Sequence, residues 1–346
     1  IFTSSATESN NLAILGTVKA TKNKRAEIIT TKADHHSVLE PFKKLEKDGV
    51  KIHCLSVDEN GLINLNELKK VLNRNTVLIS IIYANNEIGS VQPLKKIAKI
   101  ISNWKLPARS AGGEIGNSQY PYFHTDAAQA EAYLDMNVNN LGVDLLTLSS
   151  QKIHGPKGIA GLYVRQGTEI EPLVYGGGQE FGLRAATPAV PLIIGFGKAL
   201  EIANDKKRIA NSELGKLREN FIGELKKILP SVKINGPENP EDRVPSIINI
   251  TFPGIENEQL LLHLDKYGIR ASAGSACASS DIEPSHVLTA SGLTKDEARS
   301  SIRFSLSRET TRADLEYVLK ILPKVVKKIK ELYPKELKQR YYVRPD

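Results

Sequence analysis

Two spacings of apolar residues alternate along the first 200 positions of the chain. Short runs of β-branched and aromatic residues predict strands, and stretches with an apolar residue every three or four positions predict helices between them. The predicted strands cover residues 27–32, 50–57, 77–84, 123–125, 144–148 and 161–164. This alternation indicates an α/β domain with a mainly parallel sheet, and such sheets bind ligands at the carboxyl ends of their strands.

After residue 200 the pattern changes to longer helices with few strands. The predicted helices cover residues 214–228 and 315–332, and strand-like runs cover residues 247–252 and 301–306. These elements predict a second, smaller α+β domain. A stretch at 106–122 that contains Pro, Gly, Ser and Asn predicts a surface insertion between a helix and a strand.

A length of 346 residues is more than one ordinary domain uses, and the apolar content of 40% is enough to build hydrophobic cores. We therefore predict a large domain at residues 1–202 and a small domain at residues 203–346. No run of about 18 apolar residues and no signal peptide occurs, so a membrane span is not expected. The chain opens on Ile1, Phe2 and Thr3, which have the pattern of a strand end and indicate that an N-terminal segment is missing.

Positive charge exceeds negative charge along the chain. Lys and Arg outnumber Asp and Glu by 47 to 39, which gives a net charge of +8. The excess lysines alternate with apolar residues, as at Lys324, Lys327 and Lys328, and this is typical of the solvated face of an amphipathic helix. Because no basic motif interleaved with aromatic residues accompanies them, direct nucleic-acid binding is not expected.

The chain has two cysteines, Cys54 and Cys277. Two thiols are too few for a Cys-rich zinc site or a disulfide framework, so a reducing cytosol is the expected compartment. Cys54 lies in an alternating strand, which predicts a small buried side chain with a raised thiol pKa and little reactivity. Cys277 lies among Gly, Ala and Ser without periodicity, which predicts a flexible loop and makes it a candidate nucleophile.

A lysine and an aspartate follow two of the predicted strands. Lys152 comes after the strand at residues 144–148 and before a Gly-Pro-Lys-Gly turn, where an α/β enzyme presents a Schiff-base lysine. Asp126 ends the preceding strand, and a buried carboxylate there keeps a pyridinium nitrogen protonated. Alone, the lysine fits a solvated side chain and the aspartate fits a helix N-cap. The hydroxyl-rich turn at residues 3–11 opens a helix and suits a phosphate.

Seven segments resemble, in order and spacing, the group I cysteine desulfurases of the NifS and IscS kind. They are residues 5–11, 85–89, 124–129, 152–158, 176–180, 274–277 and 301–305. The resemblance implies aminotransferase fold type I, with a large domain that binds pyridoxal 5'-phosphate and a smaller C-terminal domain. It also implies a cytoplasmic homodimer. Aminotransferases and lyases of this fold share the lysine and aspartate but lack the full set with a loop cysteine.

The same resemblance implies the reaction and its main residues. Lys152 holds the cofactor and moves the substrate proton, and Asp126 pairs with the pyridine nitrogen. His35 stacks on the ring and assists proton transfer. Cys277 takes the sulfur of L-cysteine as a persulfide and leaves L-alanine.

Further residues carry implied contacts. Gln129 bonds the phenolic oxygen of the ring, and Asn86 and Arg303 hold the substrate, with Asn86 also touching the cofactor. Arg303 alone would fit a surface ion pair. The phosphate contacts are Ala6, Thr7, Ser149 and Gln151, with Thr187 reaching across a dimer interface.

The sequence departs from the family pattern at a few positions. Gln151 stands where the family usually has histidine, Ser5 replaces a glycine, and Ala185 and Ala186 replace Ser-Gly. The expected partner is a sulfur acceptor, such as an iron-sulfur scaffold or a thiolation enzyme. No resident metal is expected, although Cys277 is expected to ligate an iron-sulfur cluster transiently. The competing hypotheses are a lyase or aminotransferase on the same scaffold and a non-catalytic scaffold protein.

Overall fold

The computed structural model describes residues 1–105, 121–205, 207–274 and 284–333, and these form two units. The first unit comprises Ile1–Asp58, Leu62–Asn85 and Val91–Lys207, and the second comprises Glu59–Gly61, Asn86–Ser90 and Arg208–Asp346. Two short segments of the first half of the sequence thus belong to the second unit. The predicted domain boundary after residue 202 stays a prediction.

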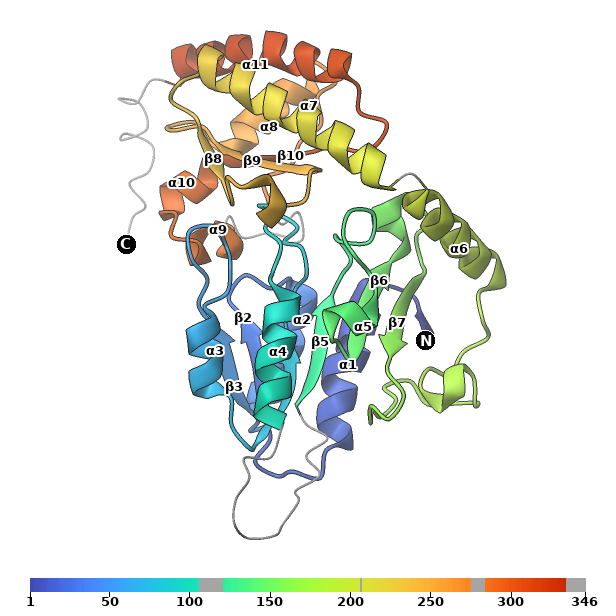
Figure 1. The fold of residues 1–346 in the computed structure, drawn as a ribbon. Helices are drawn as coiled ribbons and strands as arrows, with labels where there is room; N and C mark the ends of the chain where they lie inside the picture. Colours follow the sequence, from blue (N-terminus) through green and yellow to red (C-terminus); the bar gives the residue numbers. More distant parts are fainter. Residues whose placement is uncertain (106–120, 206, 275–283, 334–346) are drawn as a thin grey trace, which may run out of the picture. The chain divides into compact units, whose positions relative to one another are not determined.

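The first unit contains a seven-stranded sheet in the order β1-β7-β6-β5-β4-β2-β3 (Figure 1). From β3 to β6 the neighbouring strands are parallel, whereas β7 is antiparallel to both β6 and β1. The predicted α/β fold with a mainly parallel sheet is therefore confirmed. The strands are β1 Phe2–Thr3, β2 Glu27–Thr31, β3 Lys51–Leu55, β4 Thr76–Ser80, β5 Tyr122–Asp126, β6 Leu145–Ser149 and β7 Ala160–Val164.

The helices of this unit lie between the strands, as the apolar spacing predicts. They are α1 Ala6–Ala20, α2 His36–Lys47, α3 Leu65–Val71, α4 Leu94–Lys105, α5 Val138–Leu141 and α6 Val190–Asn204, with 3-10 turns η1 at Ser150–Ile153 and η2 at Glu180–Gly182. β4 ends at Ser80, four residues before the predicted end at residue 84, although the Tyr83 amide still donates to the Asp126 carbonyl at 2.9 Å. The predicted insertion at 106–122 falls almost wholly outside the described residues.

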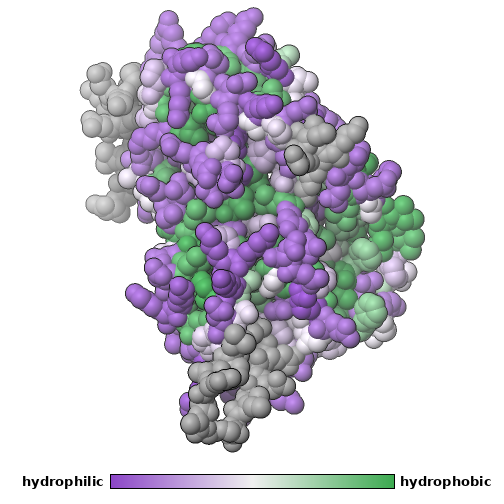
Figure 2. Space-filling view, viewed as in Figure 1, coloured by the Kyte–Doolittle hydropathy of each residue, from purple (hydrophilic) through white to green (hydrophobic). Residues whose placement is uncertain are grey.

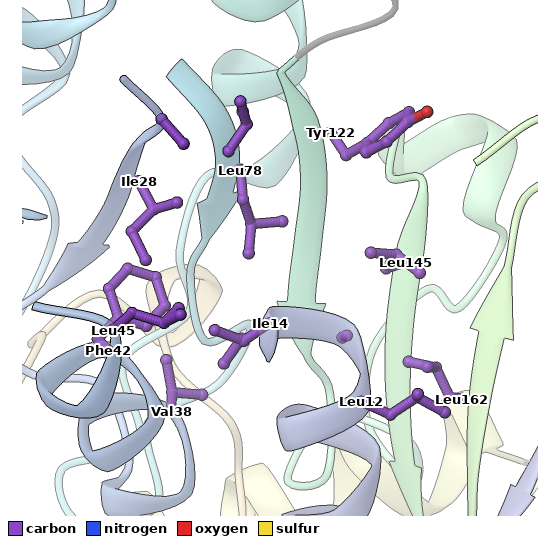
Figure 3. Packing of buried hydrophobic residues seen from close by; sticks show 13 residues of the cluster. Leu12, Ile14, Ile28, Val38, Phe42, Leu45, Leu78, Tyr122, Leu145 and Leu162 are labelled. Carbon is purple, nitrogen blue, oxygen red and sulfur yellow. The ribbon is translucent and has the colours of Figure 1, made fainter. Parts of the chain in front are cut away.

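The core of the first unit forms where α1 and α2 cover the sheet (Figure 3). Its buried side chains come from α1, α2 and five strands and include Leu12, Ile14, Ile28, Val38, Phe42, Leu78, Leu145 and Leu162. Burying each such side chain contributes roughly 1.5–3 kcal/mol to folding. Because this core clamps α1 and α2 onto the sheet, it fixes the first residues of both helices beside the carboxyl ends of the strands.

The second unit contains a three-stranded antiparallel sheet in the order β10-β9-β8. Its strands are β8 Lys233–Asn235, β9 Ile247–Thr251 and β10 Ser301–Ser305, and its helices are α7 Lys207–Ile228, α8 Asn257–Asp265, α9 His286–Ala290, α10 Lys295–Arg299 and α11 Arg312–Leu332. The predicted smaller α+β domain is confirmed, with long helices at both predicted places. Among the described helices, none has the length and apolar content that crossing a membrane requires.

Candidate cofactor and substrate site

Three of the predicted site residues lie at or just after the carboxyl ends of the parallel strands β5, β6 and β2. Asp126 is the last residue of β5, and it lies in register with Thr147 of β6. Lys152 lies in η1, directly after β6, and its side chain is exposed. His35 follows β2 and is the N-cap of α2. Parallel strands end at one edge of a sheet, so the three side chains belong to the same edge.

The carboxylate of Asp126 is buried, with 4% of the residue exposed. Its Oδ1 accepts a hydrogen bond from the Ala128 amide at 3.0 Å, and its Oδ2 accepts one from Asn10 Nδ2 at 2.7 Å. Asp126 therefore ends a strand and closes a turn, and no α-helix begins there, so the alternative of a helix N-cap is wrong. The hydroxyl-rich pattern at residues 3–11 does not indicate this contact, because Asn10 and Asp126 lie far apart in the sequence.

The His35 ring is held by residues of its own helix. Its Nδ1 accepts a hydrogen bond from the Ser37 amide at 3.1 Å and lies 2.8 Å from Ser37 Oγ. Ser37 Oγ in turn accepts from Asn10 Nδ2 at 2.8 Å. A continuous series of hydrogen bonds thus joins His35 to Asp126 through Ser37 and Asn10.

Asp34 fixes the segment that carries His35. Its buried carboxylate accepts four hydrogen bonds, from Thr30 Oγ1, from the Thr31 amide and hydroxyl, and from the Ile82 amide, at 2.7 to 3.0 Å. Burial raises the pKa of Asp34 to about 6, and the hydrogen bonds oppose that increase. The side chain therefore ties the end of β2 to the chain after β4. The sequence does not indicate this role of Asp34, because a carboxylate beside a histidine is not by itself a signal of burial.

The turn after β6 positions Lys152 through close packing. The Ser149 amide donates to the buried Glu131 carboxylate, and His154 takes a left-handed conformation with φ of 63°. A Cβ on Gly155 would collide with Ser150 Oγ and lie 2.9 Å from the Ala199 Cβ. The Gly-Pro turn after the lysine therefore requires glycine at this position.

The N-terminus of α1 has free positive potential for an anion. Ser5 caps the helix by accepting from the Glu8 amide at 3.2 Å, and its extended backbone, with φ of −165°, suits any residue. Ala6 and Thr7 are the first helical residues, so their amides have no helical carbonyl to bond. The Glu8 carboxylate accepts from the Ser4 amide at 2.7 Å and pairs with Arg184 at 2.8 Å. Burial raises the Glu8 pKa, but the bonds to Arg184 and Ser4 lower it by more. The pKa of Glu8 is therefore below its ordinary value.

The remaining predicted residues of the first unit differ in exposure. Gln129 is half-buried in the turn after β5, whereas Ser149 is buried at the end of β6. Gln151 and Thr187 are both exposed, in η1 and directly before Pro188 respectively.

Two predicted substrate residues meet in the second unit. Arg303 Nη1 donates to the Asn86 carbonyl at 2.7 Å, and the arginine is half-buried. Burial lowers the pKa of Arg303, and the nearby Glu87 carboxylate opposes that decrease. The main partner of Arg303 is thus a backbone carbonyl in a partly buried position, which does not match the alternative of a surface ion pair.

Glu87 contacts both sides of the segment at residues 275–283. The Ser285 hydroxyl donates to the Glu87 carboxylate at 2.5 Å. Gly274 has φ of 94°, and a Cβ there would lie 2.8 Å from Glu87 Oε2. Cys277 itself lies outside the described residues, so its predicted flexible loop stays a prediction. Glu87 was missed as a site residue, since its two contacts lie nearly 200 positions away in the sequence.

Cys54 is exposed on β3, so the prediction that it is a buried side chain is wrong. β3 is an edge strand of the sheet, and an alternating pattern does not tell which strand is last. Partial burial of the sulfur nevertheless raises the thiol pKa to about 11, with the Asp34 carboxylate adding to the increase.

We therefore expect Cys54 to react slowly in spite of its exposure. A thiol pKa of about 11, against the ordinary 9.0, leaves about 100-fold less thiolate at pH 8. The measurement is alkylation by iodoacetamide in a Cys277→Ser variant, in which Cys54 is the sole thiol, with a cysteine-containing peptide of the same length as control. Alkylation of Cys54 as fast as the peptide would contradict the raised pKa.

The residues at this sheet edge fit pyridoxal phosphate. The edge offers an exposed amine, a buried carboxylate and a helix N-terminus, which match the aldehyde, the pyridine nitrogen and the phosphate. Buried Asn10 Oδ1 and Ser150 Oγ also have no hydrogen-bond partner among the described residues. Within the ranges that the structure describes, no cluster of His, Cys, Asp and Glu is suited to a metal ion.

Comparisons with known proteins agree with this fit. The family model "Aminotransferase class-V" matches residues 1–318. A cysteine desulfurase IscS of Dictyoglomus turgidum is 45% identical over 334 residues, which are 96% of this chain and 80% of that relative. Among solved structures, a NifS-like protein has a TM-score of 0.84 at 33% identity, covering 94% of this chain and 82% of that one. The structure of SspA in complex with cysteine has a TM-score of 0.70 at 34% identity, with 90% and 82% covered.

A mainly parallel sheet with a lysine and an aspartate at its carboxyl edge defines a pyridoxal-phosphate enzyme of aminotransferase fold type I. The chain belongs to the aminotransferase class-V family and, within it, to the cysteine desulfurases. The resemblance drawn from the seven sequence segments is confirmed, and so are the cofactor and the enzyme class that it implied.

Proposed function

We propose that this enzyme removes the sulfur of free L-cysteine, holds it as a persulfide on Cys277 and releases L-alanine. The observation that carries the proposal is the pair of Lys152 and Asp126, which follow adjacent parallel strands in a chain that belongs to the cysteine desulfurases. The similar SspA structure holds cysteine, which supports the same substrate here.

Bound pyridoxal phosphate supplies an electron sink that lets bonds at the substrate Cα and Cβ break. Asp126, held by Asn10 and Ala128, keeps a fixed negative charge toward the pyridine nitrogen. The Lys152 amine would hold the cofactor covalently and would move the proton at the substrate Cα. His35 would lie against the ring and assist this proton transfer.

The other first-unit contacts hold the cofactor in place. The amides of Ala6 and Thr7 at the α1 N-terminus would hold the phosphate, together with Ser149 and Gln151. Gln151 donates through a neutral amide, so it adds no charge where a histidine could. Gln129 bonds the phenolic oxygen of the ring.

The substrate is held by Asn86 and Arg303, with the guanidinium bonded to its carboxylate. The Cys277 thiolate attacks the substrate sulfur, so an S–S bond forms as the Cβ–S bond breaks. The electron pair of that bond stays on carbon, which takes up a proton. One thiol and one cysteine thus give one persulfide and one alanine without any external oxidant.

Product analysis separates this function from its competitors. With L-cysteine and a dithiol reductant, we expect equal amounts of sulfide and alanine. A lyase would give pyruvate and ammonia, an aminotransferase would require a keto-acid acceptor, and a non-catalytic scaffold protein would give no product. Pyruvate as the main product, or no turnover by protein that shows the visible absorbance of bound cofactor, would refute the proposal.

We further propose a homodimer formed through an apolar surface on the first unit. Its exposed side chains are Val174, Tyr175, Phe181, Val190 and Ile194, and Phe181 is 92% exposed. Figure 2 shows hydrophobic residues gathered where α6 lies in Figure 1. Monomeric proteins rarely expose such contiguous apolar surface. Thr187 belongs to the same segment, and across the two-fold axis it would reach the phosphate of the other site.

Phe181→Asp is expected to convert the dimer to monomers at micromolar concentration, because a carboxylate cannot be buried in an apolar interface without a partner. Sedimentation velocity measures the change. The matched control is Leu262→Asp on α8, a leucine that is 68% exposed in the other unit and should leave the dimer intact. A wild-type monomer at these concentrations would refute the interface.

The names of the relatives support a proposal for the physiological partner. Similar proteins are called IscS, so we propose a sulfur-acceptor protein of iron-sulfur cluster assembly, with a tRNA-thiolation enzyme as the second candidate. Cys277 would then ligate a nascent cluster transiently. The reducing compartment that such chemistry needs is the cytoplasm.

A further inference from the structure

Asn10 and Ser37 are two buried side chains beside the proposed site. Asn10 contacts Asp126 and Ser37 contacts His35, the two residues proposed to lie against the cofactor ring. Asn10 is fully buried, and Ser37 is 7% exposed. One amide nitrogen, Asn10 Nδ2, donates to Asp126 Oδ2 at 2.7 Å and to Ser37 Oγ at 2.8 Å. The contacts join α1, the start of α2 and the end of β5, which are all parts of the first unit.

The directions of these hydrogen bonds follow from the chemistry of the groups. A carboxylate only accepts, so the Asn10 amide must turn its nitrogen to Asp126, and both of its N–H groups are then used. Because Ser37 Oγ accepts from Asn10, its own hydroxyl proton is available to His35 Nδ1, 2.8 Å away. The Ser37 amide also donates to Nδ1, at 3.1 Å. Nδ1 is thus an acceptor twice, and the proton of the neutral ring resides on Nε2.

We propose that Asn10 and Ser37 act as paired positioning residues that fix the Nε2-protonated tautomer of His35 and the orientation of Asp126 together. This inference deepens the proposed function, since it rests on His35 and Asp126 facing the cofactor ring. Asn10 touches Asp126 directly and acts on His35 only through the Ser37 hydroxyl. A change at residue 10 must therefore reach the imidazole through residue 37.

We call the hydrogen bonds from Asp126 through Asn10 and Ser37 to His35 the relay. The relay has a measurable consequence for cofactor binding. Asn10→Ala removes the hydrogen bond that orients the Asp126 carboxylate, and hydrogen bonds to charged groups are stronger than those between neutral groups. We expect the dissociation constant for pyridoxal phosphate to rise roughly 10- to 100-fold. The matched control is Asn11→Ala, next along the same helix, whose amide donates to the Thr7 carbonyl at 2.8 Å and touches neither Ser37 nor Asp126.

The decisive readout is the ¹⁵N spectrum of the His35 ring in histidine-labelled full-length protein, with and without cofactor. His35→Gln identifies the signals among those of the seven histidines. In the wild type we expect the pattern of a ring protonated at Nε2. Ser37→Ala and Asn10→Ala should each shift the Nδ1 signal, and Asn10→Ala should add no shift in a Ser37→Ala background. Asn11→Ala should leave the signal in place.

Several results would overturn the relay. These are a ring protonated at Nδ1, no shift in Ser37→Ala, or an Asn10→Ala shift of equal size with and without Ser37. Ser37→Ala removes a single oxygen atom, so it keeps the test valid if Asn10→Ala fails to fold. The cofactor-free spectrum does not depend on turnover, so it tests the relay separately from the proposed function. If the protein lacks desulfurase activity but shows the expected His35 signals, the proposed function is refuted and the relay is confirmed.

Discussion

Lys152→Ala is expected to abolish both the visible absorbance of the bound cofactor and the release of sulfur from cysteine. The amine of Lys152 is the only group at this sheet edge proposed to bond the cofactor covalently and to move the Cα proton. Losing a positioned proton-transfer group alone costs up to about 10⁴-fold in rate. Absorbance spectra and the rate of alanine formation measure the two effects.

Lys157→Ala is the matched control for this loss. Lys157 is an exposed lysine of the same Gly-Pro-Lys-Gly turn, and we expect its variant to keep the absorbance and the activity. Borohydride should link the cofactor to the wild type and to Lys157→Ala only. A borohydride-stable adduct on Lys157, or one retained in Lys152→Ala, would show that another lysine binds the cofactor.

Cys277→Ser is expected to bind cysteine and cofactor normally yet transfer no sulfur. Lys152 and Arg303 remain, so the substrate still binds, whereas a hydroxyl at pH 7 is neither ionised nor able to hold a persulfide. A cysteine-dependent change of the absorbance without formation of alanine would show this arrest. Mass spectrometry of wild-type protein after brief exposure to cysteine should find one added sulfur atom on the peptide of Cys277.

Cys54→Ser separates a specific sulfur acceptor from general thiol chemistry. Cys54 is exposed, so accessibility alone would favour it, but its pKa of about 11 leaves little thiolate. We expect this variant to keep full activity and the persulfide on Cys277. A persulfide found on Cys54 alone, or desulfurase turnover by Cys277→Ser, would overturn both the assignment and the mechanism.

Much of the fold is readable from the sequence because its signals are local. The spacing of apolar residues is a property of each element, so β2, β6 and α11 appear at the predicted places. The position of a strand within the sheet is not local. Cys54 was predicted to be buried because its strand alternates, and it is exposed because that strand lies at the sheet edge.

The site divides in the same way. The positions of Lys152 and Asp126 could be predicted, since each lies at or shortly after the end of a hydrophobic strand and parallel strands share an edge, whereas their roles stay predictions. Asn10 and Asp126 are 116 residues apart, and no sequence pattern indicates that the amide of one bonds the carboxylate of the other. The roles of Asp34 and Glu87 could not be predicted from the sequence for the same reason. A buried carboxylate needs hydrogen-bond donors around it, and only the folded chain brings those donors together.

The contacts of Glu87 bear on which substitutions the second unit tolerates. Ser285 donates to the Glu87 carboxylate, and a Cβ at Gly274 would lie 2.8 Å from the same carboxylate. Gly274 also has a φ of 94°, a backbone conformation that residues with a side chain rarely adopt. A substitution at position 274 is therefore penalised twice, and a shorter side chain at position 87 would relieve the collision but not the backbone strain.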